Sequence, residues 1–151
     1  MYAKILVPVD GSKTAARAVN EAIDLAIALK SDVRVISVVD NSDRFFDVGY
    51  YDPLSLNKQM LVEAKRVLAE ALALLTAKGV NADRELVEDP IAPGDISGTI
   101  LQHGALWGAQ VIVVGTHGRR GVRRLVMGSV AEGIVRKAKI PVLLIHTDVP
   151  D

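Results

Sequence analysis

Two glycine-containing segments have the residue types that a phosphate-binding site needs. Residues 115–118 read Gly-Thr-His-Gly, and Gly128-Ser129 follows after nine further residues. An uninterrupted apolar run at 111–114 leads into the first segment, and a helical pattern begins near Gly128. Glycine lets a ligand approach the backbone closely, and free N–H groups at the start of a helix attract anions. The spacing therefore predicts a strand, a glycine-bearing loop and a helix N-terminus that together bind a phosphate.

The charges around these segments favour the same interpretation. No acidic residue occurs between Asp95 and Glu132, and four arginines lie within that interval, at positions 119, 120, 123 and 124. A solvated basic loop has the same composition. Because the arginines lie between the two glycine segments, we favour anion binding.

Each of these residues also has a purely structural explanation. Gly115 and Gly118 are typical of a tight turn after a strand, and the Ser129 hydroxyl is typical of a helix N-cap. Asp10 precedes a glycine and is typical of a turn as well. Gly128 is more informative, because glycine is a poor helix former and only modestly favoured at the N-cap. The combined pattern favours a ligand site.

Strands and helices alternate along the chain. The expected strands are residues 5–9, 33–39, 81–87, 111–114 and 142–145, and the expected helices begin near 14, 55, 95 and 128. Strand 81–87 is less apolar than the others and is expected nearer the sheet edge, while 41–53 is an irregular segment containing four aromatic residues. This order predicts an α/β fold with a parallel sheet and helices on both faces. Ligands bind such sheets at the carboxyl ends of the strands, where Asp10, Val38 and Gly115 lie.

Composition limits the class of protein. The 151 residues are half hydrophobic, so one domain over 1–151 is expected, and 18 basic residues balance 18 acidic ones. Neither nucleic acid nor an anionic membrane surface is favoured by that balance. The chain has no cysteine, enters a strand pattern at once, and has no apolar run near the ~20 residues of a membrane span. We therefore expect a cytoplasmic protein.

The motifs resemble those of a known family over essentially the whole chain. Residues 5–12 read Ile-Leu-Val-Pro-Val-Asp-Gly-Ser, the two glycine segments follow the family spacing, and Ile-Pro-Val-Leu occupies 140–143. The chain thus resembles the universal stress protein family, in its ATP-binding branch. The resemblance implies strand order 3-2-1-4-5 and a nucleotide-responsive regulatory function in the stress response.

The resemblance also implies a ligand and a partner. ATP, with Mg²⁺ or Mn²⁺ on its phosphates, would be held by Pro8, Val9, Asp10, Val38, Gly115, Thr116, His117, Gly118, Arg119, Gly128, Ser129 and Val130. Asp10 would bind the ribose, Pro8 and Val38 would lie against the adenine, and the glycine segments would hold the phosphates. A homodimer would form through the last strand, at Val142, Leu143, Leu144 and Ile145.

Catalytic groups are scarce around the expected phosphates. No glycine is followed by Lys-Ser or Lys-Thr, so the P-loop lysine is absent. His117 is more typical of a solvent-facing loop residue, and His103 and His146 have no partner at metal-ligand spacing, so no metal site is predicted from side chains. We expect ATP binding without fast hydrolysis. Two alternatives remain open: a slow ATPase or phosphoryl- or nucleotidyl-transferring enzyme that uses Asp10 or His117, and a nucleotide-free dimerising module.

Overall fold

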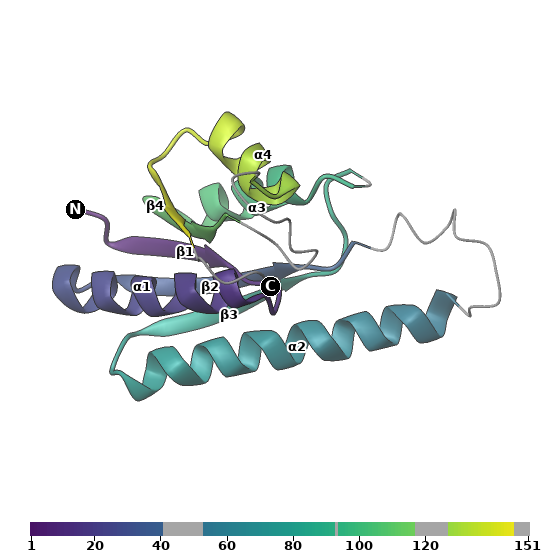
Figure 1. Cartoon of the computed structure of the whole chain (residues 1–151), viewed down its shortest axis with the longest axis horizontal. Helices are drawn as coiled ribbons and strands as arrows, with labels where there is room; N and C mark the ends of the chain where they lie inside the picture. Colours follow the sequence, from purple (N-terminus) through teal and green to yellow (C-terminus); the bar gives the residue numbers. More distant parts are fainter. Residues whose placement is uncertain (41–52, 93, 117–126, 147–151) are drawn as a thin grey trace.

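The chain folds around one five-stranded parallel sheet. A computed structural model describes residues 1–40, 53–92, 94–116 and 127–146. Its elements in chain order are β1 (Lys4–Pro8), α1 (Lys13–Leu29), β2 (Asp32–Val38), α2 (Pro53–Ala77), β3 (Ala82–Val87), α3 (Ile96–Trp107), β4 (Val111–Gly115), α4 (Ser129–Lys137) and β5 (Val142–Ile145). The strand order is β3-β2-β1-β4-β5, and each adjacent pair is parallel. Strands β1 to β4 are labelled in Figure 1. The predicted fold class and strand order are confirmed.

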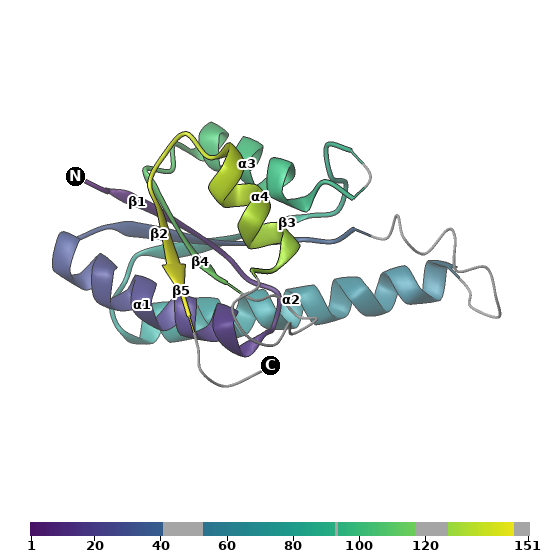
Figure 2. The same ribbon diagram turned by 45° about the horizontal axis from the view of Figure 1, so that its top comes forward.

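Helices cover both faces of the sheet. Helices α1 and α2 lie on one face, and α3 and α4 lie on the other (Figure 2). Successive side chains of a strand point to opposite faces, so Ile5 and Val7 join the core under α1 and α2, while Leu6 joins the core under α3 and α4. Strands buried on both faces carry continuous apolar runs, which explains the composition of β1 and β4.

The predicted element boundaries hold to within about two residues. Strand β4 extends to Gly115, and α2 begins at Pro53, which the sequence pattern assigns to the end of the irregular segment. Residues 41–52 of that segment lie outside the described residues. Strand β3 lies at the sheet edge, as its lower apolar content predicted.

The C-terminus of α2 shows how a glycine ends a helix. Gly79 has φ +79° and donates its N–H to Thr76 O at 3.0 Å, while Val80 donates to Leu75 O at 3.1 Å. This pair of bonds satisfies carbonyls that the helix leaves unpaired, and it requires a left-handed residue. Gly79 therefore ends α2.

The described residues form four α-helices. Within the described ranges, none is both long and apolar enough to cross a membrane.

Candidate functional site

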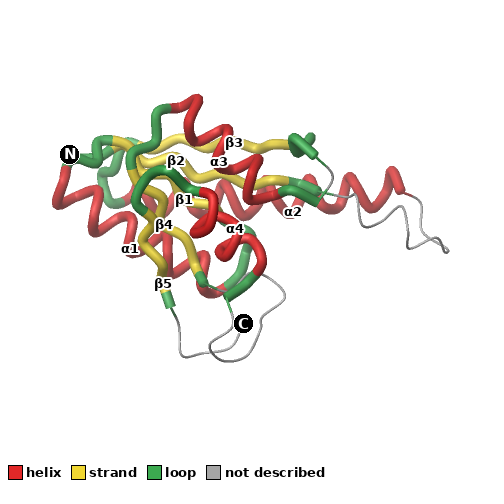
Figure 3. The backbone as a smooth tube through the Cα atoms, turned by 90° about the horizontal axis from the view of Figure 1, so that it is seen from above, coloured by secondary structure: helices red, strands yellow, loops and turns green. Residues whose placement is uncertain are grey.

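Three neighbouring parallel strands, β1, β2 and β4, have their carboxyl ends on the same side of the sheet. Strand β1 pairs with β2 on one side and with β4 on the other. Beyond the strands, Val9 N–H donates to Ile36 O at 2.9 Å, and Val39 N–H donates to Val87 O at 2.8 Å. Strands β1, β2 and β4 run side by side in Figure 3, so their carboxyl ends lie close to one another, as the sequence predicted.

Asp10 lies in the turn after β1. Its Oδ1 accepts the Ser12 N–H at 2.9 Å, and the Ser12 hydroxyl accepts the Ala15 N–H at 3.1 Å to cap α1. Gly11 between them has φ +87°, which a side chain rarely adopts. The structural explanation of Asp10 as a turn residue is therefore confirmed, and this turn holds the carboxylate at the end of β1.

The two glycine segments meet through Thr116. Its carbonyl accepts the Gly128 N–H at 2.7 Å, and its N–H donates to Ile145 O on β5 at 3.0 Å. Thr116 is 1% exposed, so the junction lies inside the protein. Residues 117–126 follow Thr116 in the sequence and lie outside the described residues. They include the predicted site residues His117, Gly118 and Arg119. The end of β4 is thus held against the start of α4.

Gly115 is required by packing. A Cβ at this position would lie 2.8 Å from the backbone carbon of Thr14 and 2.9 Å from its oxygen. Real Cβ atoms do not approach backbone so closely, because atoms in folded proteins are already close-packed. The close approach of α1 to β4 therefore explains the glycine. A tight turn after the strand is not the reason for this glycine, since Gly115 belongs to β4.

The N-terminus of α4 has no side-chain cap. Gly128 is the N-cap residue, with φ −63° and ψ 158°, and its carbonyl accepts the Glu132 N–H at 3.0 Å. Ser129 is the first helical residue, so the interpretation of its hydroxyl as the cap is wrong: a capping side chain belongs to the residue before the helix. The first-turn N–H groups of Ser129 and Val130 form the positive end of the helix dipole.

Apolar residues line the ends of β1 and β2. Pro8 and Val9 are buried, and Val9 packs into the core under α1 and α2. Val38 is half-buried and packs against the core under α3 and α4. Val9 and Val38 thus pack on opposite faces of the sheet, and Asp10 follows Val9 directly after β1.

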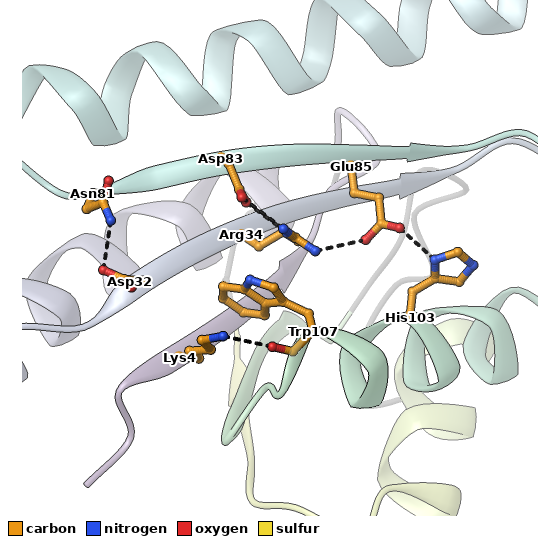
Figure 4. Close-up of polar contacts among 8 residues, drawn as sticks. All are labelled: Lys4, Asp32, Arg34, Asn81, Asp83, Glu85, His103 and Trp107. Atoms are coloured by element: carbon orange, nitrogen blue, oxygen red, sulfur yellow. Dashed lines mark hydrogen bonds and ion pairs between the residues drawn. The ribbon is translucent and has the colours of Figure 1, made fainter.

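A polar cluster elsewhere on the sheet was not predicted. Sequence spacing gave His103 no metal-ligand partner, but the fold gives it a carboxylate partner: its Nδ1 lies 2.6 Å from Glu85 Oε2 (Figure 4). Arg34 binds Asp83 through Nε at 2.8 Å and Nη2 at 2.9 Å, and it lies 4.8 Å from the Trp107 ring centre. The hydrogen bonds to Asp83 raise the pKa of Arg34 above its usual value.

This cluster joins α3 to the strands and does not resemble a metal site. In the part of the chain that the structure describes, no group of three or more histidine and carboxylate side chains is arranged to hold a metal ion. Sequence spacing did not reveal the cluster, because its members come from β2, β3 and α3.

Known proteins share both this sequence pattern and this fold. The profile of the universal stress protein family matches residues 1–146. Universal stress protein MJ0531 of Methanocaldococcus jannaschii is 31% identical over 146 residues, which cover 96% of this chain and 82% of the relative. The crystal structure of a universal stress protein family member from Burkholderia pseudomallei is 36% identical, with a TM-score of 0.77 over 95% of this chain and 96% of that one.

Solved structures with this fold include complexes with adenine nucleotides. The universal stress protein of Archaeoglobus fulgidus in complex with dAMP is 25% identical, with a TM-score of 0.70 over 95% of this chain and 98% of that one. The profile match covers nearly the whole sequence, and the fold is shared from end to end. This chain belongs to the universal stress protein family.

Proposed function

We propose that this protein binds ATP at the carboxyl ends of β1, β2 and β4 and acts as a nucleotide-responsive regulatory protein of the stress response. The observation that carries the proposal is the contact between Thr116 O and Gly128 N at 2.7 Å. It brings the start of α4, which has no side-chain cap, to the carboxyl ends of the strands, where doubly wound folds bind ligands. The dAMP complex of the Archaeoglobus fulgidus relative supports an adenine nucleotide as the ligand.

The residues present fit such a nucleotide. The backbone of Pro8, Val9 and Val38 at the ends of β1 and β2 would lie against the adenine, and the Asp10 carboxylate suits the ribose hydroxyls. The phosphates would lie at the first turn of α4, where backbone N–H groups favour negative charge. The proposed phosphate contacts are Gly115, Thr116, His117, Gly118, Arg119, Gly128, Ser129 and Val130.

In this proposal the metal ion binds to the nucleotide phosphates and enters the site together with them. Mg²⁺ or Mn²⁺ binds phosphate oxygens and waters readily and needs few protein carboxylates. Bound there, the ion would neutralise phosphate charge. The described residues offer the Asp10 carboxylate near the strand ends and no group of three ligands. Because the sequence lacks the P-loop lysine, we propose binding without fast ATP hydrolysis.

The regulatory output is proposed to pass through β5. This strand forms one edge of the sheet, and Leu143 on it is 42% exposed. An apolar edge strand presents unpaired backbone groups to a second copy, which supports a homodimer through Val142, Leu143, Leu144 and Ile145. Thr116 donates to Ile145 O on that strand and accepts from Gly128. One residue thus touches both the proposed phosphate site and the proposed dimer edge.

Calorimetric titration tests the proposal directly. The protein is first freed of co-purified nucleotide, checked by denaturing a sample, and then titrated with Mg-ATP and separately with AMP. We expect the wild type to bind ATP, and Gly128→Val to lose binding while its circular dichroism spectrum is unchanged. Ala105→Val, which adds the same kind of bulk at an exposed position of α3, is the matched control. Absence of ATP binding by folded, nucleotide-free wild type would overturn the proposal.

A further inference from the structure

Helix α4 packs on α3 through a glycine. Gly133 is buried at the middle of α4 and faces Ser97, which is 8% exposed, in the first turn of α3. A Cβ at Gly133 would lie 2.7 Å from Ser97 Cβ and closer still to Ser97 Oγ. The hydroxyl is able to rotate away, but Cβ is fixed by the α3 backbone. Glycine is therefore the only residue that fits here without moving one helix away from the other.

A polar contact one turn further along holds the same helix face. Lys137 Nζ donates to Ser97 Oγ at 3.2 Å and to Asp95 Oδ1 at 3.4 Å. Asp95 is the N-cap of α3 and accepts the Gly98 N–H at 2.9 Å. Residues four apart on a helix share a face, so Gly133 and Lys137 bring one side of α4 onto the start of α3.

The other end of α4 reaches the proposed phosphate site. The helix has only nine residues, and Gly133 is about 7 Å along the axis from Gly128. A short helix moves as a rigid body, so a displacement at Gly133 is carried to the first turn. There the Gly128 N–H bond to Thr116 O, at 2.7 Å, would lengthen. Hydrogen bonds weaken steeply when geometry is lost, and ligand sites tolerate only about half an ångström.

We propose that the Gly133–Ser97 contact positions the phosphate-binding end of α4 and so sets the affinity for the phosphate part of the nucleotide. Both residues lie outside the proposed ligand contacts and act through the placement of α4. This inference rests on the proposed function and adds two positioning residues to it.

The variant Gly133→Ala tests the contact. Its methyl group pushes α4 away from α3, and the first-turn N–H groups shift relative to the strand ends. We expect ATP to bind about tenfold more weakly, as for the loss of one hydrogen bond to a charged group. Adenosine, which has no phosphate, should bind as it does to the wild type. A general loss of structure would weaken both ligands alike, so the ATP-to-adenosine ratio separates positioning from instability.

Rescue gives a sharper test. Ser97→Gly removes the atoms that the new methyl group meets, and also the Lys137 bond to Ser97 Oγ, so Gly133→Ala combined with Ser97→Gly should recover most but not all of the ATP affinity. Combining it with Ser97→Ala should not, because the Cβ that would lie 2.7 Å away remains. Val135→Ala, at a 43% exposed position of α4, is the matched control and should leave both affinities unchanged.

The outcomes separate this inference from the proposed function. If wild type binds no ATP, the proposed function is wrong and the inference falls with it. If wild type binds ATP and folded Gly133→Ala binds it equally well, only the inference is wrong; equal weakening of ATP and adenosine also overturns it. If Gly133→Ala does not fold, Lys137→Met replaces it, since this removes the Nζ contacts without adding bulk at Ser97. For Lys137→Met we expect a loss of ATP affinity smaller than the loss of about tenfold expected for Gly133→Ala, with unchanged adenosine binding. Unchanged ATP binding by this variant contradicts the inference.

Discussion

Glu85 on β3 and His103 on α3 are in contact, with 2.6 Å between Oε2 and Nδ1 (Figure 4). Each side chain is only about a quarter exposed, at 26% and 27% respectively. The other carboxylate oxygen, Oε1, lies 3.5 Å from Arg34 Nη1 and has no hydrogen bond within the described ranges. His103 is therefore the hydrogen-bond partner of a carboxylate that is largely removed from water, and it joins α3 to the edge strand.

Replacing His103 should weaken this junction. His103→Leu leaves the Glu85 carboxylate without its hydrogen-bond partner, and we expect the free energy of unfolding to fall by about 1 kcal/mol. We expect a small loss of stability for a hydrogen bond to a charged group, because both side chains retain some solvent contact. Urea unfolding followed by circular dichroism measures it.

A matched variant separates the hydrogen bond from the shape of the ring. His103→Gln keeps a donor within reach of Glu85 and should recover more than half of the loss. Equal destabilisation by both variants would show that ring packing, not the bond to the carboxylate, explains the contribution of His103.

The fold was predictable because its determinants are local in the sequence. The apolar runs at 5–9 and 111–114 indicated strands buried on both faces, and the lower apolar content of 81–87 indicated the edge strand β3. The strand order itself followed from the family resemblance. The Glu85–His103 pair was not predictable, because its residues are 18 apart and meet only once β3 and α3 are placed.

The candidate site was predicted in position more than in detail. That the end of β4 meets the start of α4 follows from the alternation of strand and helix, and the Thr116–Gly128 bond shows this meeting. The reason for Gly115 was not visible in the sequence, because it depends on how closely α1 approaches β4 at Thr14. Contacts of this kind depend on interhelical and helix–strand distances, which periodicity does not specify.

Gly115→Ala should therefore affect stability. The added methyl group would meet Thr14 backbone atoms at 2.8 and 2.9 Å, and we expect overpacking to cost about 1–3 kcal/mol in urea unfolding. Gly79→Ala is the comparison, since nothing lies within 4 Å of its Cβ and only the left-handed backbone, at φ +79°, is strained. We expect it to cost about 1–2 kcal/mol. Unchanged stability of Gly115→Ala with lost ATP binding would instead indicate a direct role for Gly115 at the ligand.

The acid side of the stability profile should depend on Asp95. The Gly98 N–H bond, and then Lys137, lower the pKa of Asp95 from its ordinary value of 3.8. A carboxyl whose folded pKa is depressed stabilises the fold above its unfolded pKa, and this contribution is lost as pH falls through the folded pKa. We therefore expect the melting temperature of wild type to fall below about pH 4 partly through this group.

Asp95→Asn isolates that charge. Asparagine caps helices as well as aspartate does, so the Gly98 bond is retained while the attraction to Lys137 is lost. Its melting temperature should change less than that of wild type between about pH 6 and pH 3. Asp95→Ala removes cap and charge together and should be less stable at every pH. If the melting temperatures of wild type and Asp95→Asn fell by the same amount as the pH was lowered, the carboxylate charge would add no stability.

The proposed dimer edge makes one further prediction. Leu143 is 42% exposed on β5, at the edge of the sheet, and Leu143→Lys places a charge where a second copy would pair. Charged side chains on an edge strand disfavour strand pairing, so sedimentation velocity should show a dimeric wild type and a monomeric variant. Leu74→Lys, at a 48% exposed position of α2 away from this edge, adds the same charge and should remain dimeric. If both variants stay dimeric, the copies associate through another surface; if both dissociate, net charge and not the β5 edge controls assembly.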